Sequence, residues 1–316
     1  MWSFPVAILS SLLVTVLTLR LARRWSPDSR MGLALAWGTA AGHLAWTASN
    51  EFSASSPESG WGDVLRATLS ILFSPREASQ WVVPILLLLG VCELIGGLWR
   101  SRRSAGTTAP RSGETWIRIG LWAGVYAGTL LRLLWGSVYL TRRWSVLEAI
   151  VTIAIQVVGL LVILLVSRLP GNGRVLGWRY AATLIASGAA CGVIGMSGSA
   201  VFAQLLSTAV VSLLLCSILA WWERASEPAR EWPIGMILLV ISMHIWLGHY
   251  FAELSVLDGC LLQGAVAAGA LFGAGGESRS LWWNRVLPSV VSVVLSATAV
   301  GHAAFTLSKT LANPGW

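Results

Sequence analysis

The residues best placed for chemistry form a short polar turn, Gly195-Met196-Ser197-Gly198-Ser199, inside an uncharged stretch that runs from Tyr180 to Trp222. A serine hydroxyl becomes a nucleophile when an adjacent base takes its proton, and free N–H groups at a helix N-terminus can stabilise the resulting oxyanion. We expect Ser197 to lie at such a helix start, with Gly195 and Gly198 shaping the oxyanion site or the turn. The alternative is a tight turn between two helices that uses small residues.

All four histidines fall in apolar segments, and two of them are candidates for the base. His249 and His302 lie toward the outer ends of their segments, at about the depth expected of Ser197. His43 and His302 stand in similar sequences, TAAGHLAWTAS and TAVGHAAFTLS, which would suit two axial ligands of a haem. We favour histidines that hydrogen-bond neighbouring helices, and we predict no cofactor and no metal site.

Glu93 and Arg132 define a second candidate site, because ionisable groups at membrane depth are costly and point to function. Together with His43 they would form the site of a transporter. At 1.5 Å per residue the two backbones differ in depth by roughly 10 Å, so an ion pair requires both side chains to extend. Alternatively, Arg132 extends outward to the membrane surface.

The composition indicates a membrane protein. Of 316 residues, 55% are hydrophobic and 11% charged, which leaves too little polar surface for a soluble domain. About 20 apolar residues cross a bilayer, and by this criterion the sequence predicts an all-α polytopic bundle of about ten transmembrane helices. The predicted spans are residues 2–20, 31–50, 81–99, 117–140, 146–167, 178–195, 199–222, 232–250, 254–274 and 286–308.

The distribution of the arginines predicts the orientation in the membrane. Most of the 22 basic residues fall on one side if the N-terminus is outside, so the positive-inside rule places both termini on the outer side. This pattern also accounts for the net charge of +8, and we predict no nucleic-acid partner. The absence of an organelle-targeting pattern favours a bacterial inner membrane.

The longest predicted outer loop, residues 51–80, carries an apolar stripe that follows a plausible helix cap at Asp63. We expect it to form an amphipathic helix in the outer interface. The stripe consists of Val64, Leu65, Leu69, Leu72 and Phe73.

A second motif, from Leu257 to Gly273, reads LDGCLLQGAVAAGALFG. Together with the Gly-x-Ser-Gly at Ser197, it resembles the rhomboid family of intramembrane serine proteases. The fourth core helix of that family opens with GxSG, and its sixth has a pattern like D-x-x-A-H-x-G-G-x-x-A-G-x-x-x-G. The matching positions, including one where a glycine ends the fifth helix, are Gly248, Asp258, Gly264, Ala268, Gly269 and Gly273.

The resemblance implies a six-helix rhomboid-like core over residues 116–276, best matched over 178–276, with Gly264, Gly269 and Gly273 packing helices together. Residues 1–115 would then be an N-terminal three-span addition, and residues 277–316 an additional C-terminal span. In a rival register, the second and third spans supply the first two core helices.

The departures from the family pattern decide the expected activity. Leu262 occupies the position of the catalytic histidine, and the family's His-x-x-x-Asn is missing from the second helix in either register. The resemblance therefore implies a pseudoprotease in the lipid bilayer that binds transmembrane segments of client proteins. Two alternatives stay open: an active protease that uses Ser197 with His249 or His302 as base, and a transporter built around Glu93 and Arg132.

Overall fold

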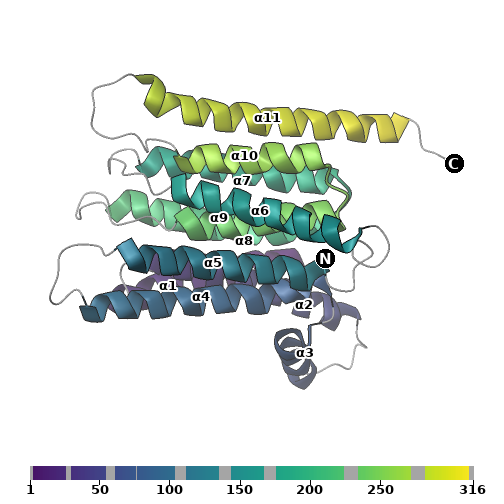
Figure 1. Ribbon diagram of the computed structural model, residues 1–316. Helices are drawn as coiled ribbons and strands as arrows, with labels where there is room; N and C mark the ends of the chain where they lie inside the picture. The colour runs from purple at the N-terminus through teal and green to yellow at the C-terminus, as the bar shows by residue number, and fades with distance from the viewer. Residues whose placement is uncertain are drawn as a thin grey trace. The chain divides into compact units, whose positions relative to one another are not determined.

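The computed structural model describes residues 3–25, 30–54, 61–75, 77–103, 112–134, 144–166, 176–223, 234–271 and 282–312. Within these ranges every regular element is a helix, which confirms the all-α prediction (Figure 1). The helices are α1 (Ser3–Trp25), α2 (Arg30–Ala54), α3 (Trp61–Phe73), α4 (Ala78–Arg103), α5 (Ser112–Leu134), α6 (Val146–Val166), α7 (Leu176–Met196), α8 (Ala200–Glu223), α9 (Ile234–Phe251), α10 (Val256–Leu271) and α11 (Trp282–Ala312).

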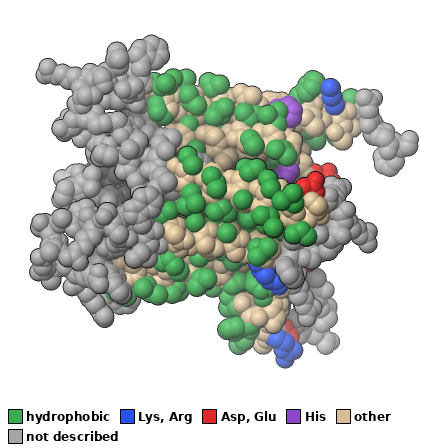
Figure 2. All heavy atoms as spheres, viewed as in Figure 1, with side chains coloured by type: hydrophobic (Ala, Val, Ile, Leu, Met, Phe, Trp, Pro, Cys, Tyr) green, Lys and Arg blue, Asp and Glu red, His purple; other side chains and the backbone are tan. Residues whose placement is uncertain are grey.

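The helices are apolar enough for a membrane-embedded protein. In the described residues, 4 segments are long and apolar enough to cross a membrane, and they lie in α1, α4, α8 and α11. Shorter apolar segments lie in α5, α6, α7, α9 and α10. Hydrophobic side chains also cover much of the described surface in view (Figure 2). Each predicted span overlaps one of these helices or α2, whereas the count of ten spans and the orientation of the termini stay predictions.

The apolar stripe of the outer loop does form a helix, α3. Ile71 of α3 is fully buried and packs with Ala48 of α2 and Val83 of α4. Asp63 lies inside the first turn of the helix, where its carboxylate pairs with Arg66 at 3.6 Å, so it is not the residue before the helix start. The helix is therefore attached to its neighbours by one apolar side.

The chain divides into two compact units, Met1–Leu164 and Leu165–Trp316. In the first unit α2 packs against α1, α3 and α4, and α5 packs against α4. Trp37 of α2 occupies the space that a side chain at Gly90 of α4 would need, and its Nε1 donates to the Leu87 carbonyl over 3.4 Å. The two helices are thus held close by a glycine. The predicted domain boundaries after residues 115 and 276 stay predictions.

In the second unit, α7 packs against α8, α10 and α11, and α10 also packs against α9 and α11. The main chains of α7 and α10 come close together, because a Cβ added at Gly269 would lie 2.9 Å from the Thr183 main-chain nitrogen and 3.1 Å from the Ala182 carbonyl carbon. Main chain therefore meets main chain at this point, as small residues allow in membrane helix pairs.

Two further glycines lie at helix contacts in the second unit. A Cβ at Gly248 of α9 would lie 2.9 Å from Cγ1 of Ile194 in α7, and one at Gly264 of α10 would lie 3.3 Å from Cδ1 of Leu295 in α11. Gly273, the third predicted packing glycine, lies outside the described residues.

We predict that Gly269→Ala destabilises the protein by about 1–3 kcal/mol, because the added methyl group has to displace the main chain of α7. The measurement is reversible unfolding in detergent micelles. Gly301→Ala is the matched control, since an added Cβ on this residue of α11 meets nothing within 4 Å. Equal free energies of unfolding for the two variants would contradict the close main-chain contact between α7 and α10.

Candidate functional site

Ser197 directly follows Met196, the last residue of α7. Its main-chain N–H donates to the Val193 carbonyl over 2.9 Å, and its Oγ donates to the Ile194 carbonyl over 2.8 Å. Gly198 follows with φ +110°, a conformation that favours glycine, and the chain then turns into α8. The main-chain hydrogen bond extends the helical pattern of α7 by one residue, and Ser197 and Gly198 then form the turn.

The start of α8 is capped by Ser199, not by Ser197. The Phe202 N–H donates to Ser199 Oγ over 3.4 Å, and the Ala203 N–H donates to the Ser199 carbonyl over 3.3 Å. The expected position of Ser197 at a helix N-terminus is therefore not observed. A helix C-terminus presents carbonyl groups and the negative end of the helix dipole, which do not stabilise an oxyanion. Gly195 and Gly198 are expected to shape either an oxyanion site or the turn, and the geometry suits the turn.

Leu262 stands where the predicted resemblance would place a histidine, and this position is buried in the second unit. Leu262 on α10 is fully buried, with 0% of its surface exposed. A leucine side chain has neither donor nor acceptor, so this position contributes packing and supplies no base.

His249 holds the connection between α9 and α10. Its Nδ1 lies 2.7 Å from the Leu254 carbonyl oxygen, and because that oxygen only accepts, Nδ1 carries the proton. The Leu254 N–H donates back to the Gly248 carbonyl over 3.2 Å, and Glu253 between them has φ 55°. The imidazole therefore stabilises a tight turn at the end of α9.

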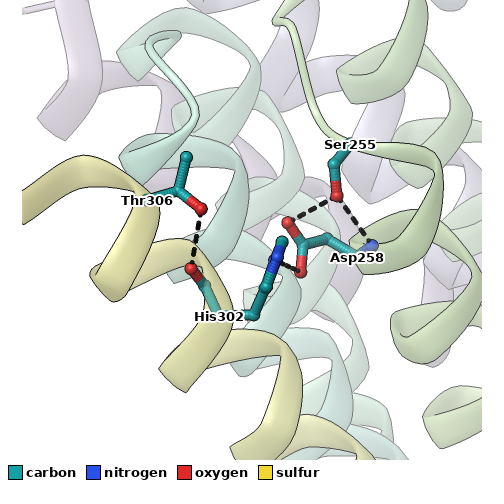
Figure 3. Close-up of polar contacts among 4 residues, drawn as sticks. All are labelled: Ser255, Asp258, His302 and Thr306. Atoms are coloured by element: carbon teal, nitrogen blue, oxygen red, sulfur yellow. Dashed lines mark hydrogen bonds and ion pairs between the residues drawn. The ribbon is translucent and has the colours of Figure 1, made fainter. Parts of the chain in front are cut away.

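His302 is paired with Asp258 across two helices (Figure 3). Nδ1 of His302 in α11 lies 2.9 Å from Oδ1 of Asp258 in the first turn of α10. The other carboxylate oxygen accepts a hydrogen bond from Ser255 Oγ over 2.8 Å, and Ser255 Oγ in turn accepts from the Asp258 N–H over 3.0 Å. The Asp258 side chain is only 6% exposed and that of His302 is 38% exposed, so one edge of the imidazole faces outward.

This cluster has the orienting half of a hydrolase triad, in which a carboxylate fixes Nδ1 and leaves Nε2 for a nucleophile. Among the described residues, neither His302 nor His249 hydrogen-bonds to Ser197. The structure therefore brings Asp258 and His302 together but does not join them to the serine. In this arrangement the pair connects α10 to α11.

Sequence reasoning did not single out Ser255, although a local signal was present. Ser255 and Asp258 form the Ser-x-x-acid pattern that caps helix starts. The same pattern recurs at the start of α6, where the Ser145 N–H donates to Glu148 Oε2 over 2.7 Å and the Glu148 N–H donates to Ser145 Oγ over 3.2 Å. The partnership of Asp258 with His302 has no such local signal.

In the alternative site, Arg132 and Glu93 lie far apart. The Arg132 guanidinium lies over the Trp81 ring, with Cζ 3.8 Å from the centroid, and Trp81 is about 18 Å from Glu93 along α4 at 1.5 Å per residue. Glu93 and His43 are both buried in the first unit, at 2% and 0% exposure. Outward extension of Arg132 thus describes the geometry better than pairing with Glu93. His302 belongs to the second unit, and the transport and haem sites stay predictions.

The described residues also contain no cluster of three or more His, Cys, Asp or Glu side chains that could hold a metal ion. Comparison with known proteins adds no relative, since no family model, curated protein or solved structure matches the chain. The candidate site therefore consists of the serine turn and the Ser255–Asp258–His302 cluster.

We predict that Asp258 and His302 are energetically coupled. In a double-mutant cycle of Asp258→Asn and His302→Gln, the coupling should be about 1 kcal/mol, because the carboxylate is nearly buried while the imidazole is 38% exposed. The measurement is again unfolding in micelles. The control cycle combines Asp258→Asn with Lys309→Gln. The Lys309 ammonium contacts the Phe305 ring, 4.4 Å from its centroid, and not Asp258. If the effects are additive in both cycles, the hydrogen bond between Asp258 of α10 and His302 of α11 does not stabilise the protein.

Proposed function

We propose that the protein is a rhomboid-like pseudoprotease of a bacterial inner membrane, which binds transmembrane helices of partner proteins without cleaving them. One observation carries this proposal: the Ser197 hydroxyl donates to the Ile194 carbonyl at the end of α7, while Leu262 fills the position of the base.

The energetics of a serine nucleophile support the absence of cleavage. Removing one member of a serine–histidine unit typically costs on the order of a million-fold in kcat. Ser197 would also have to give up its hydrogen bond to Ile194 before it could react, in surroundings where other acceptors are scarce.

An open face on α7 supports helix binding. Gly188 and Gly192 are exposed, and a Cβ added to either would meet nothing within 4 Å in the described residues. Ile185, one turn before Gly188, is 53% exposed. Glycines four residues apart let a second membrane helix approach the main chain closely, and an adjacent aliphatic side chain adds contact area. The proposed occupant is a single transmembrane helix of a partner protein.

A second candidate function, an active serine protease, is favoured by one feature. Asp258 orients His302 through Nδ1, as the acid of a triad does. In this case the hydroxyl of Ser197 would have to leave the Ile194 carbonyl and approach Nε2 of His302.

We predict that a serine-directed fluorophosphonate probe does not label Ser197 in the folded protein, because the hydroxyl lacks a base. The measurement is labelling of the full chain reconstituted in lipid, with Ser197→Ala and His302→Ala compared in parallel. Labelling that disappears in both variants would establish the protease instead.

We predict that Gly188→Leu combined with Gly192→Leu weakens association with a co-reconstituted single-span helix several-fold, since the leucines keep the helix main chains apart. The measurement is energy transfer between fluorophores on the two proteins. A leucine at Gly301, an open glycine on α11, should leave association unchanged. Equal energy transfer in the double variant and the wild type would exclude the glycine face as the binding site.

A further inference from the structure

Arg132 is stacked on an aromatic ring of a neighbouring helix. It lies in the last turn of α5 and is exposed, and its guanidinium is stacked on Trp81 in the first turn of α4, 3.8 Å from the ring centroid. The indole covers one face of the guanidinium and stabilises it through a cation–π contact. The side chain is thereby fixed between two packed helices of the first unit.

The hydrogen-bonding edges of this guanidinium are not used by an acidic partner. The stacking on Trp81 is the contact that Arg132 makes in the described part of the chain, and neither Asp63, which pairs with Arg66, nor Asp258, which pairs with His302, is its partner. A guanidinium presents five coplanar N–H donors, and stacking leaves them directed outward in the geometry that suits the oxygens of a phosphate.

The exposed side of α3 is a second, independent indication that this end of the first unit lies at a membrane surface. Opposite its buried Ile71, α3 exposes a row of apolar side chains four residues apart, and α4 with Trp81 begins shortly after α3 ends. An attached helix with such a row lies in the region between headgroups and acyl chains. The exposed side chains are Leu65 (60%), Leu69 (45%) and Phe73 (80%). Tryptophan is also enriched at this depth, where lipid phosphates lie.

We propose that Arg132, stacked on Trp81, binds the phosphate of an anionic phospholipid headgroup, with the apolar row of α3 at the same membrane surface. The chemistry recognised is a phosphate oxyanion, which a lipid or free phosphate could supply. The row on α3 favours the lipid, because it provides apolar surface that free phosphate would not use. This inference needs only a membrane-embedded first unit, so it is independent of client binding by α7.

The test is binding of a fluorescent phosphatidylglycerol to the full-length protein in detergent, measured by anisotropy. We expect Arg132→Gln to weaken binding about tenfold, the loss of one charge-assisted interaction. Arg66→Gln is the matched control, because this arginine of α3 is 85% exposed and already paired with Asp63. It should bind like the wild type. Unlabelled phosphatidylglycerol should compete better than phosphatidylcholine.

Two further measurements distinguish a lipid phosphate from free phosphate and provide a second variant in case the first does not fold. If inorganic phosphate at millimolar concentration competes as well as phosphatidylglycerol, the ligand is free phosphate and the lipid site is overturned. Equal affinity of Arg132→Gln and wild type also overturns it. If Arg132→Gln does not fold, Trp81→Leu keeps the charge and removes the platform. We expect a several-fold loss for this variant, and unchanged binding would exclude the site.

Discussion

Hydroxyl groups within apolar helices have few acceptors in reach other than main-chain carbonyls of the preceding turn. The structure shows this constraint repeatedly: Thr39, Ser187, Ser207 and Ser217 each donate to the carbonyl four residues earlier, over distances from 2.7 to 2.8 Å. Ser197 follows the same rule with the carbonyl three residues earlier. Its hydrogen bond is therefore the ordinary behaviour of a serine in this chain, and it removes the hydroxyl from the chemistry that its glycine neighbours suggested.

Three polar contacts connect α10 to its neighbours in the second unit. Asp258 of α10 pairs with His302 of α11, Ser292 of α11 donates to the Ala265 carbonyl over 2.8 Å, and Gln263 of α10 donates to Ser242 of α9 over 2.6 Å. All three involve α10, which also lies main chain to main chain on α7 at Gly269. The residues of the Asp258–Gly273 motif thus serve as the packing centre of the unit.

Much of the architecture could be predicted because it follows from local patterns. Apolar runs located the long helices, an apolar stripe located α3, and small polar residues located the turn at Ser197. The position of Ser197 within that turn could not be predicted, since one residue decides whether a serine ends one helix or starts the next, and Ser199 took the capping role. The stacking of Arg132 on Trp81 and the pairing of His302 with Asp258, which is 44 residues away, depend on tertiary packing. The resemblance to rhomboid proteases and the binding of client helices remain predictions, because no contact within this chain tests them.

The most direct test of the claim that Ser197 has no base is the reactivity of a cysteine placed there. In a variant that carries Ser197→Cys and alanine at the four native cysteines, the rate of alkylation by iodoacetamide should be low at pH 6–7. It should rise only at alkaline pH, because an unassisted thiol has a pKa of about 8.5 or higher when partly buried. Rapid alkylation at pH 6 that disappears when His302 or His249 is replaced would reveal an activating histidine and contradict the account.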